Sequence, residues 1–100
     1  MRIDWSLPAR DIHNLIRAQS PPYPGAFSHF RGQRLELLKT ASAPRDYRGT
    51  PGRLLGTPDG VVALCGPPGP QGLLIETVAP EQSEPMPASQ FFAGCSGYFD

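Results

Sequence analysis

Apolar residues recur with helical spacing near the start of the chain. Ile12, Leu15 and Ile16 stand at positions i, i+3 and i+4, and charged residues occupy the other sides. This spacing is typical of an amphipathic helix with one apolar face. Because the residue before a proline avoids helical geometry, Pro21 ends the pattern. The sequence therefore predicts a helix over about residues 7–19.

After residue 25 the hydrophobic period changes from helical to alternating, which is typical of β-strands. Turn signals separate the alternating segments, among them Gly32 and the run Thr57-Pro58-Asp59-Gly60, in which proline, aspartate and glycine favour a tight turn. A last segment, 86–94, has the length of one short helix that ends at Gly94. The predicted strands span 26–30, 34–42, 52–56, 60–65 and 73–78.

These elements predict a mainly β fold: a small OB-like open barrel of about five strands, with a leading helix and a short C-terminal helix. One hundred residues is the size of one domain, and a hydrophobic content of 39% allows one modest core. The 13 prolines and 11 glycines lie between apolar runs and indicate many turns. We therefore expect 1–100 to form one domain.

The stretch "SPPYPGAF" (20–27) raises the question of a linker, a ligand for a proline-binding module, or a corner within the fold. A proline-rich ligand has to be exposed and extended. This stretch instead stands between a predicted helix and a predicted strand. We predict a fixed corner, with Tyr23 as the residue that faces a partner.

Charge is divided unevenly along the chain although the net charge is zero. All nine basic residues and four of the nine acidic residues lie in 1–53, and the other five acidic residues follow. Such asymmetry can mark a basic binding face, or two halves of one domain that attract each other. The zero total does not favour a dedicated nucleic-acid binder, which usually carries a strongly basic domain.

The chain shows no complete set of catalytic or metal-binding residues. His13, His29, Cys65 and Cys95 lack the spacing of metal ligands, and the two cysteines suit reduced, structural thiols in the cytoplasm. No apolar run is long enough for a signal peptide or a membrane-spanning helix. Trp5 either caps the core of this domain or is buried against a neighbour.

The segment "RIDWSLPARDIHNLIRAQSPPYPGAFSHFRGQRLELLKT" (2–40) resembles the start of the C-terminal domain of the folate-dependent formyltransferases. The matching features are "IDW", a helix with "IxxLIRA", then "PYPGAF", then a hairpin. The tail "MPASQFFAG" (86–94) resembles the closing element of that domain. The family includes enzymes that formylate methionyl-tRNA and enzymes that formylate sugar amines.

The resemblance implies an OB-like barrel that follows a Rossmann-like catalytic domain. That other domain carries the catalytic residues and uses 10-formyltetrahydrofolate, so this chain is expected to hold no catalytic residue, cofactor or metal, and the catalytic domain is the expected partner, in cis or in trans. In the family, the region that matches "DW" and "PYPGAF" lies towards the catalytic domain. The implied interdomain or substrate-side candidates are Asp4, Trp5, Arg17 and Tyr23.

Three functions follow from the resemblance. The first is a non-catalytic accessory domain of an N-formyltransferase that acts on a small or nucleotide-linked amine, and the second is a tRNA-holding domain of a methionyl-tRNA formyltransferase. The third is a stand-alone structural module. A homo-oligomer remains open, and no membrane partner is expected. On the tRNA hypothesis the expected phosphate contacts are Arg31, Arg34, Lys39, Arg45, Arg48 and Arg53.

Overall fold

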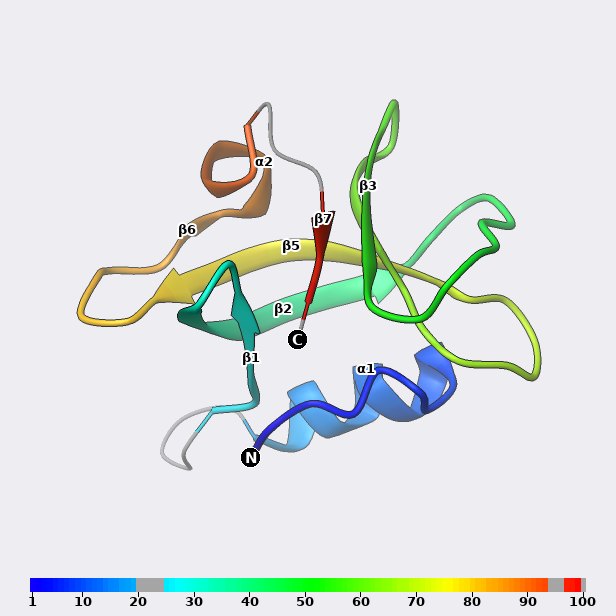
Figure 1. Ribbon diagram of the computed structural model, residues 1–100, viewed down its shortest axis with the longest axis horizontal. Helices are drawn as coiled ribbons and strands as arrows, with labels where there is room; N and C mark the ends of the chain where they lie inside the picture. The colour runs from blue at the N-terminus through cyan, green and yellow to red at the C-terminus, as the bar shows by residue number, and fades with distance from the viewer. Residues whose placement is uncertain (20–24, 94–96, 100) are drawn as a thin grey trace.

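The computed structural model describes residues 1–19, 25–93 and 97–99 (Figure 1). Most of them lie in a curved antiparallel sheet, with one helix beneath it and a second, short helix at the side. The elements are α1 (Ala9–Ala18), β1 (Phe27–Phe30), β2 (Gln33–Ser42), β3 (Arg53–Thr57), β4 (Gly60–Leu64), β5 (Gly72–Pro80), β6 (Met86–Pro87), α2 (Ala88–Phe91) and β7 (Gly97–Tyr98).

The sheet runs in the order β1-β2-β5-β4-β3-β7, and β6 pairs with β5. A bridge between Phe30 of β1 and Phe99, the residue after β7, brings the two ends of this order together. The sheet is therefore a nearly closed barrel, and the predicted mainly β, barrel-like fold with two helices is confirmed. The five predicted strands correspond to β1–β5.

β2 and β5 are the longest strands and form the floor of the barrel (Figure 1). Their register runs from Leu35 opposite Pro80 to Ser42 opposite Leu73, with shifts on either side of Lys39. An extra residue in one strand bends the strand and strengthens its twist. This irregularity lets two long strands curve around a small core.

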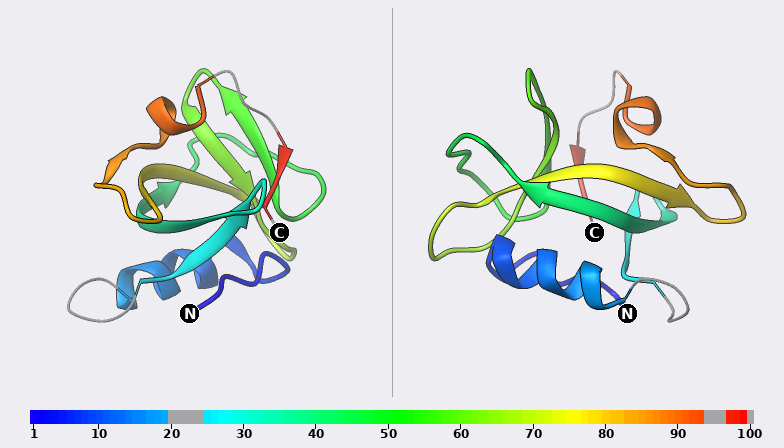
Figure 2. Two further views of the ribbon diagram at one scale, coloured as in Figure 1. Left: turned by 60° about the vertical axis from the view of Figure 1, so that its left-hand side comes forward. Right: turned by 180° about the vertical axis from the view of Figure 1, so that it is seen from behind.

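α1 lies below the sheet, against β2 (Figure 2). Ile12 and Ile16 are fully buried, as the predicted apolar face requires, while Leu15 is half-buried at its margin. Burying two isoleucine side chains contributes about 3 to 6 kcal/mol of hydrophobic free energy. The predicted helix is confirmed with slightly shorter bounds.

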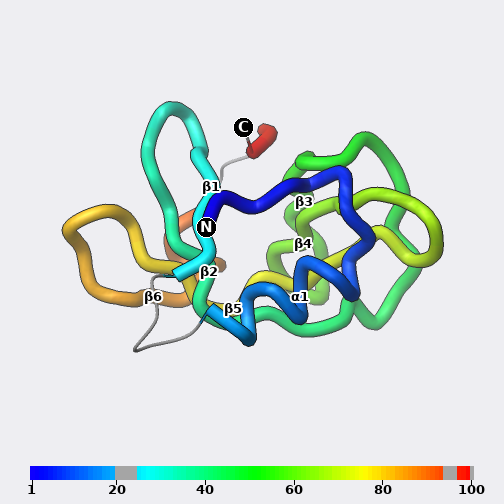
Figure 3. Tube along the Cα trace, turned by 90° about the horizontal axis from the view of Figure 1, so that it is seen from below, coloured from blue at the N-terminus to red at the C-terminus, as the bar shows by residue number. Residues whose placement is uncertain are grey.

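The segment before α1 runs beside β1 and closes the lower end of the barrel (Figure 3). Ile3 N–H donates to the carbonyl of Phe27 at 2.8 Å, and Phe27 N–H donates to the carbonyl of Met1 at 2.9 Å. A second bridge joins Pro8 to Gly66. A Cβ atom on Gly66 would overlap the carbonyl oxygen of Ser6, so the close approach requires glycine.

The closing segment differs from the single helix predicted over 86–94. Met86 and Pro87 pair with Val78 and Thr77 of β5 as β6, and α2 then covers only four residues. The prolines explain this, because Pro87 occupies the N-cap position with extended backbone and leaves the preceding residue outside the helix. Gly94 and the prolines of the predicted corner at 20–24 lie outside the described residues.

Candidate functional site

Trp5 lies inside the barrel and takes part in an aromatic cluster. Its indole stacks on the ring of Phe99 with centroids 4.6 Å apart and an angle of 10° between the planes. The indole N–H donates a hydrogen bond of 2.9 Å to the hydroxyl of Ser28. Only 7% of Trp5 is exposed. The structure therefore favours the alternative in which Trp5 caps the core of its own domain, and leaves little of the indole for a neighbour.

Asp4 is exposed beside Trp5 and organises the turn into α1. Its carboxylate accepts hydrogen bonds from the hydroxyl of Ser6 at 2.6 Å and from Ser6 N–H at 3.0 Å. These bonds, the hydroxyl first, hold the pKa of Asp4 below its ordinary value because they favour the charged form. Asp4 has this local role whether or not a partner covers it.

Of the two other interdomain candidates, Arg17 is exposed in the last turn of α1. Tyr23 lies outside the described residues. The chain between Met1 and α1 runs in the opposite direction to the helix along the same end of the barrel (Figure 3). Asp4 and Trp5 belong to that segment before the helix, and Arg17 belongs to the last turn of α1.

The six basic candidates divide into separate groups. Arg31 lies in the turn between β1 and β2 and Arg34 lies at the start of β2, whereas Arg45 and Arg48 follow the far end of β2. The long strand β2 separates these two pairs (Figure 1). Lys39 and Arg53 are exposed on β2 and at the start of β3.

The side chains of Arg45 and Arg48 are already paired with acids. Arg45 Nε lies 3.1 Å from the carboxylate of Asp59, and Arg48 lies 2.9 Å from the carboxylate of Asp46. Asp59 also accepts a hydrogen bond of 2.7 Å from the hydroxyl of Tyr47. The Arg45 pair joins the basic and acidic halves of the chain. Both arginines are well exposed, so these pairs contribute little to stability.

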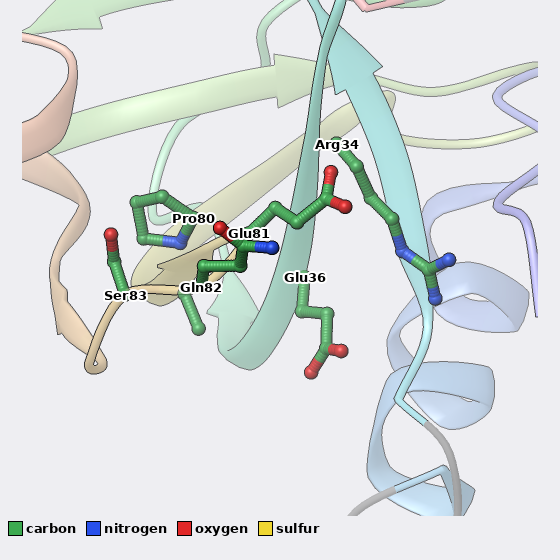
Figure 4. Close-up of a pocket in the computed structure, with 7 residues that line it drawn as sticks. Arg34, Glu36, Pro80, Glu81, Gln82 and Ser83 are labelled. Atoms are coloured by element: carbon green, nitrogen blue, oxygen red, sulfur yellow. The ribbon is translucent and has the colours of Figure 1, made fainter.

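A pocket of about 250 Å³ lies beside Arg34, at the end of the barrel where β5 leads into β6 (Figure 4). The carboxylates of Glu36 and Glu81 line it together with Arg34. The guanidinium of Arg34 is also held over the ring of Phe27, 3.9 Å from the centroid. Two carboxylates against one guanidinium do not suit a phosphate, so Arg34 is a weaker phosphate contact than its exposure suggests.

A second hollow, of about 580 Å³, lies between the start of α1 and the loop that precedes β5. Its lining is largely apolar and includes Ala9, Pro68 and Leu73. His13 lies at its margin, where its Nδ1 atom is 2.7 Å from the hydroxyl of Thr40. That partner gives His13 a structural role, in line with the sequence interpretation.

The remaining groups with possible reactivity are the cysteine thiols and the potential metal ligands. Burial raises the pKa of the Cys65 thiol from 9.0 to about 12, so the thiol stays protonated near neutral pH. Cys95 lies outside the described residues. Among residues 1–19, 25–93 and 97–99, no group of three or more histidine, cysteine or acidic side chains is placed to hold a metal ion. None of the described helices is long and apolar enough to cross a membrane.

Comparison with known proteins assigns the chain to a family. Residues 1–96 match the family described as "Formyl transferase, C-terminal domain". The chain belongs to this family. The resemblance stated from the "IDW" and "PYPGAF" segments is thereby confirmed.

Relatives of this formyltransferase C-terminal domain are named methionyl-tRNA formyltransferase. The protein of Chloroflexus aurantiacus is 39% identical over 93 residues, which are 93% of this chain and 29% of that protein. Those of Parafrankia sp. and Acetivibrio thermocellus are 34% and 33% identical over 94 residues each, covering 94% and 92% of this chain and 30% and 29% of the relatives. The chain thus spans less than a third of the length of the proteins it matches.

The roles of three residues in or beside β1 and β7 escaped the sequence analysis. Phe99 stacks on Trp5, Ser28 accepts its indole hydrogen bond, and Tyr98 is 51% exposed between the two strand ends that nearly close the barrel. The available signal was the alternation in Gly97-Tyr98-Phe99, in which Tyr98 is exposed and Phe99 is buried. Three residues are too few for a periodic pattern to stand out.

Proposed function

We propose that this chain is the C-terminal domain of a methionyl-tRNA formyltransferase, and that it holds the tRNA while a catalytic domain in cis transfers the formyl group. The observation that carries the proposal is the match of nearly the whole chain to relatives with that name. It favours the tRNA hypothesis over the small or nucleotide-linked amine. The stand-alone module is disfavoured because the relatives are more than three times as long as the matched region.

The chemistry of the described residues supports a binding role. In the whole enzyme, 10-formyltetrahydrofolate would supply the formyl group to the acceptor amine, and the chemistry would take place in the catalytic domain. Within the described residues no buried side-chain nitrogen or oxygen lacks a partner, so the interior offers no polar group for a pterin. The one described cysteine is held protonated. These residues do not fit the cofactor, and no step of the transfer is assigned to them.

On this proposal we expect a weak, electrostatic contact with RNA. Phosphate contacts fix the position of a protein on nucleic acid without reading sequence. Arg53 and Lys39 are the exposed candidates with no ion pair to an acid of the described residues. Because the net charge is zero, we expect only a few phosphate contacts.

A salt titration of tRNA binding to the 100-residue chain tests the proposal. Each phosphate contact changes the slope of log affinity against log salt by roughly 0.7 on single strands and roughly 0.9 on B-form DNA. We expect measurable binding at about 20 mM salt and a slope of roughly −2 to −4. Absence of tRNA binding at that salt concentration would exclude the tRNA-holding role. The small-amine hypothesis, with which the zero net charge is compatible, would then be the better one.

Two arginine variants provide a matched comparison. Arg53→Gln removes an exposed cation that has no described acidic partner, so it should weaken tRNA binding and reduce the slope by about 1. Arg48→Gln also removes one positive charge, but Asp46 already neutralises that charge. The loss of tRNA affinity should therefore be smaller than for Arg53→Gln. Equal losses in the two variants would mean that the chain binds tRNA through diffuse charge and not through the proposed surface.

A further inference from the structure

The register of β7 places an exposed tyrosine next to an exposed arginine. Tyr98 of β7 is the direct antiparallel partner of Arg53, at the start of β3. Both side chains are exposed, whereas the residues that follow them in their own strands, Leu54 and Phe99, are buried. Side chains of directly opposed residues on one face lie about 4.5 to 5.5 Å apart at Cβ. Arg53 and Tyr98 therefore stand side by side on the outside of the barrel.

The hydrogen bonds of this short ladder bring the two side chains close. Phe99 N–H donates to the carbonyl of Gly52 at 2.7 Å. Hydrogen-bonded and non-hydrogen-bonded pairs alternate along an antiparallel ladder, so the next pair, Arg53 and Tyr98, is a non-hydrogen-bonded pair. In such pairs the side chains approach most closely. The phenol of Tyr98 and the guanidinium of Arg53 therefore belong to neighbouring residues on the same outer face of the barrel.

A second arginine lies on the other side of β7. Phe30 of β1 bridges to Phe99, and Arg31 follows Phe30 directly (Figure 1). The guanidinium of Arg31 is 5.3 Å from the centroid of the Phe30 ring. A Cβ atom on Gly97 would lie 3.6 Å from that ring, so the ring rests against β7. Positive charge is therefore present on both sides of Tyr98.

An open aromatic face flanked by cations matches the chemistry of an unpaired nucleotide. A base stacks on the aromatic ring, and guanidinium groups contact the phosphates on either side of it. Tyr98 is 51% exposed, so part of its ring is open to solvent. We propose that Tyr98 and Arg53 form a stacking subsite for one unpaired nucleotide of an RNA strand. The identity of that strand as tRNA rests on the proposed function; the stacking chemistry does not.

Fluorescence anisotropy with a labelled single-stranded oligoadenylate of about eight nucleotides tests the subsite, using the 100-residue chain at about 20 mM salt. Loss of one base–aromatic stack weakens binding by about 5- to 150-fold. We expect that loss for Tyr98→Leu, which keeps an apolar side chain, and a change of less than about 2-fold for Tyr98→Phe, which keeps the ring. Arg53→Gln should weaken binding, and Arg48→Gln should have a smaller effect.

An abasic strand of the same length separates stacking from charge. Tyr98→Leu and the wild-type chain should bind the abasic strand equally, and a thermal melt of each variant verifies that it is folded. Absence of wild-type binding to oligoadenylate, equal binding by Tyr98→Leu, or equal losses in the leucine and phenylalanine variants would each overturn the proposal. Equal binding would assign the surface to a protein partner.

The same variants titrated with tRNA distinguish the two proposals. If the wild-type chain binds tRNA but Tyr98→Leu loses affinity for neither RNA, the subsite is wrong and the tRNA-holding role stands. If the wild-type chain binds oligoadenylate through Tyr98 but not tRNA, the subsite stands and the tRNA-holding role is wrong.

Discussion

At the scale of single residues, the structure gives Trp5 and Asp4 a role in holding the fold. Trp5 combines a ring stack on Phe99 with a hydrogen bond to Ser28, and Asp4 fixes the turn beside it. A sequence shows that a tryptophan near charges is unusual, but burial depends on residues distant in the chain. Here the partners are 23 and 94 residues away, which no local pattern reveals.

Trp5→Phe tests the structural role of the indole. Phenylalanine can still stack on Phe99, but it lacks the N–H donor and the second ring. We expect a loss of about 1 to 3 kcal/mol in the free energy of unfolding, measured by urea denaturation with circular dichroism. Leu7→Ala, at a position that is 38% exposed, should cost less than about 0.5 kcal/mol. Similar losses in both variants would contradict the core position of Trp5.

The buried thiol of Cys65 makes the free energy of unfolding depend on pH in the alkaline range. Below pH 9 the thiol keeps its proton in both the folded and the unfolded chain. Between pH 9 and about 12 only the unfolded chain releases it, because burial raises the folded pKa. Stability should therefore fall as pH rises, by at most about 1.4 kcal/mol per pH unit.

Denaturation of Cys65→Ala gives the matched measurement, with Cys95→Ser in both proteins so that one thiol is read. Between about pH 9 and 11 the protein that keeps Cys65 should lose stability more steeply than the alanine variant. Parallel curves for the two proteins would show that the thiol ionises as freely in the folded chain as in the unfolded one.

At the scale of elements, hydrophobic periodicity was sufficient for α1 and for β1–β5, because each has enough residues to show one buried face. β6 and β7 have two residues each and carry no period. Their pairing depends on the curvature of β5 and on the near closure of the barrel, which are properties of the whole sheet. The subsite at Tyr98 was missed for the same reason, since its neighbour Arg53 is far away in sequence.

Gly66 tests the contact between the segment before α1 and the barrel. In Gly66→Ala the new methyl group would overlap the Ser6 carbonyl and separate Pro8 from its bridge partner. We expect a loss of about 2 kcal/mol or more in the free energy of unfolding. Gly56→Ala is the control, because a Cβ atom at Gly56 meets nothing within 4 Å. A loss no larger than that of the control would show that the bridge does not hold this segment.

At the scale of the whole molecule, the sheet order brings the two differently charged halves of the sequence into contact. β2, from the basic half, pairs with β5, from the acidic half, and Arg45 pairs with Asp59 across the halves. Part of the charge asymmetry along the sequence is therefore balanced within one barrel. What remains is a set of separated cations, of which those around β7 adjoin an exposed aromatic ring.

The most direct test of the tRNA-holding role is a map of backbone amide chemical shifts in the isotopically labelled 100-residue chain on addition of tRNA at low salt. The proposed role predicts shifts concentrated on β7, the start of β3 and the turn between β1 and β2. No shifts at all would contradict the tRNA-holding role, and shifts confined to the hollow beside α1 would contradict the surface proposed for it.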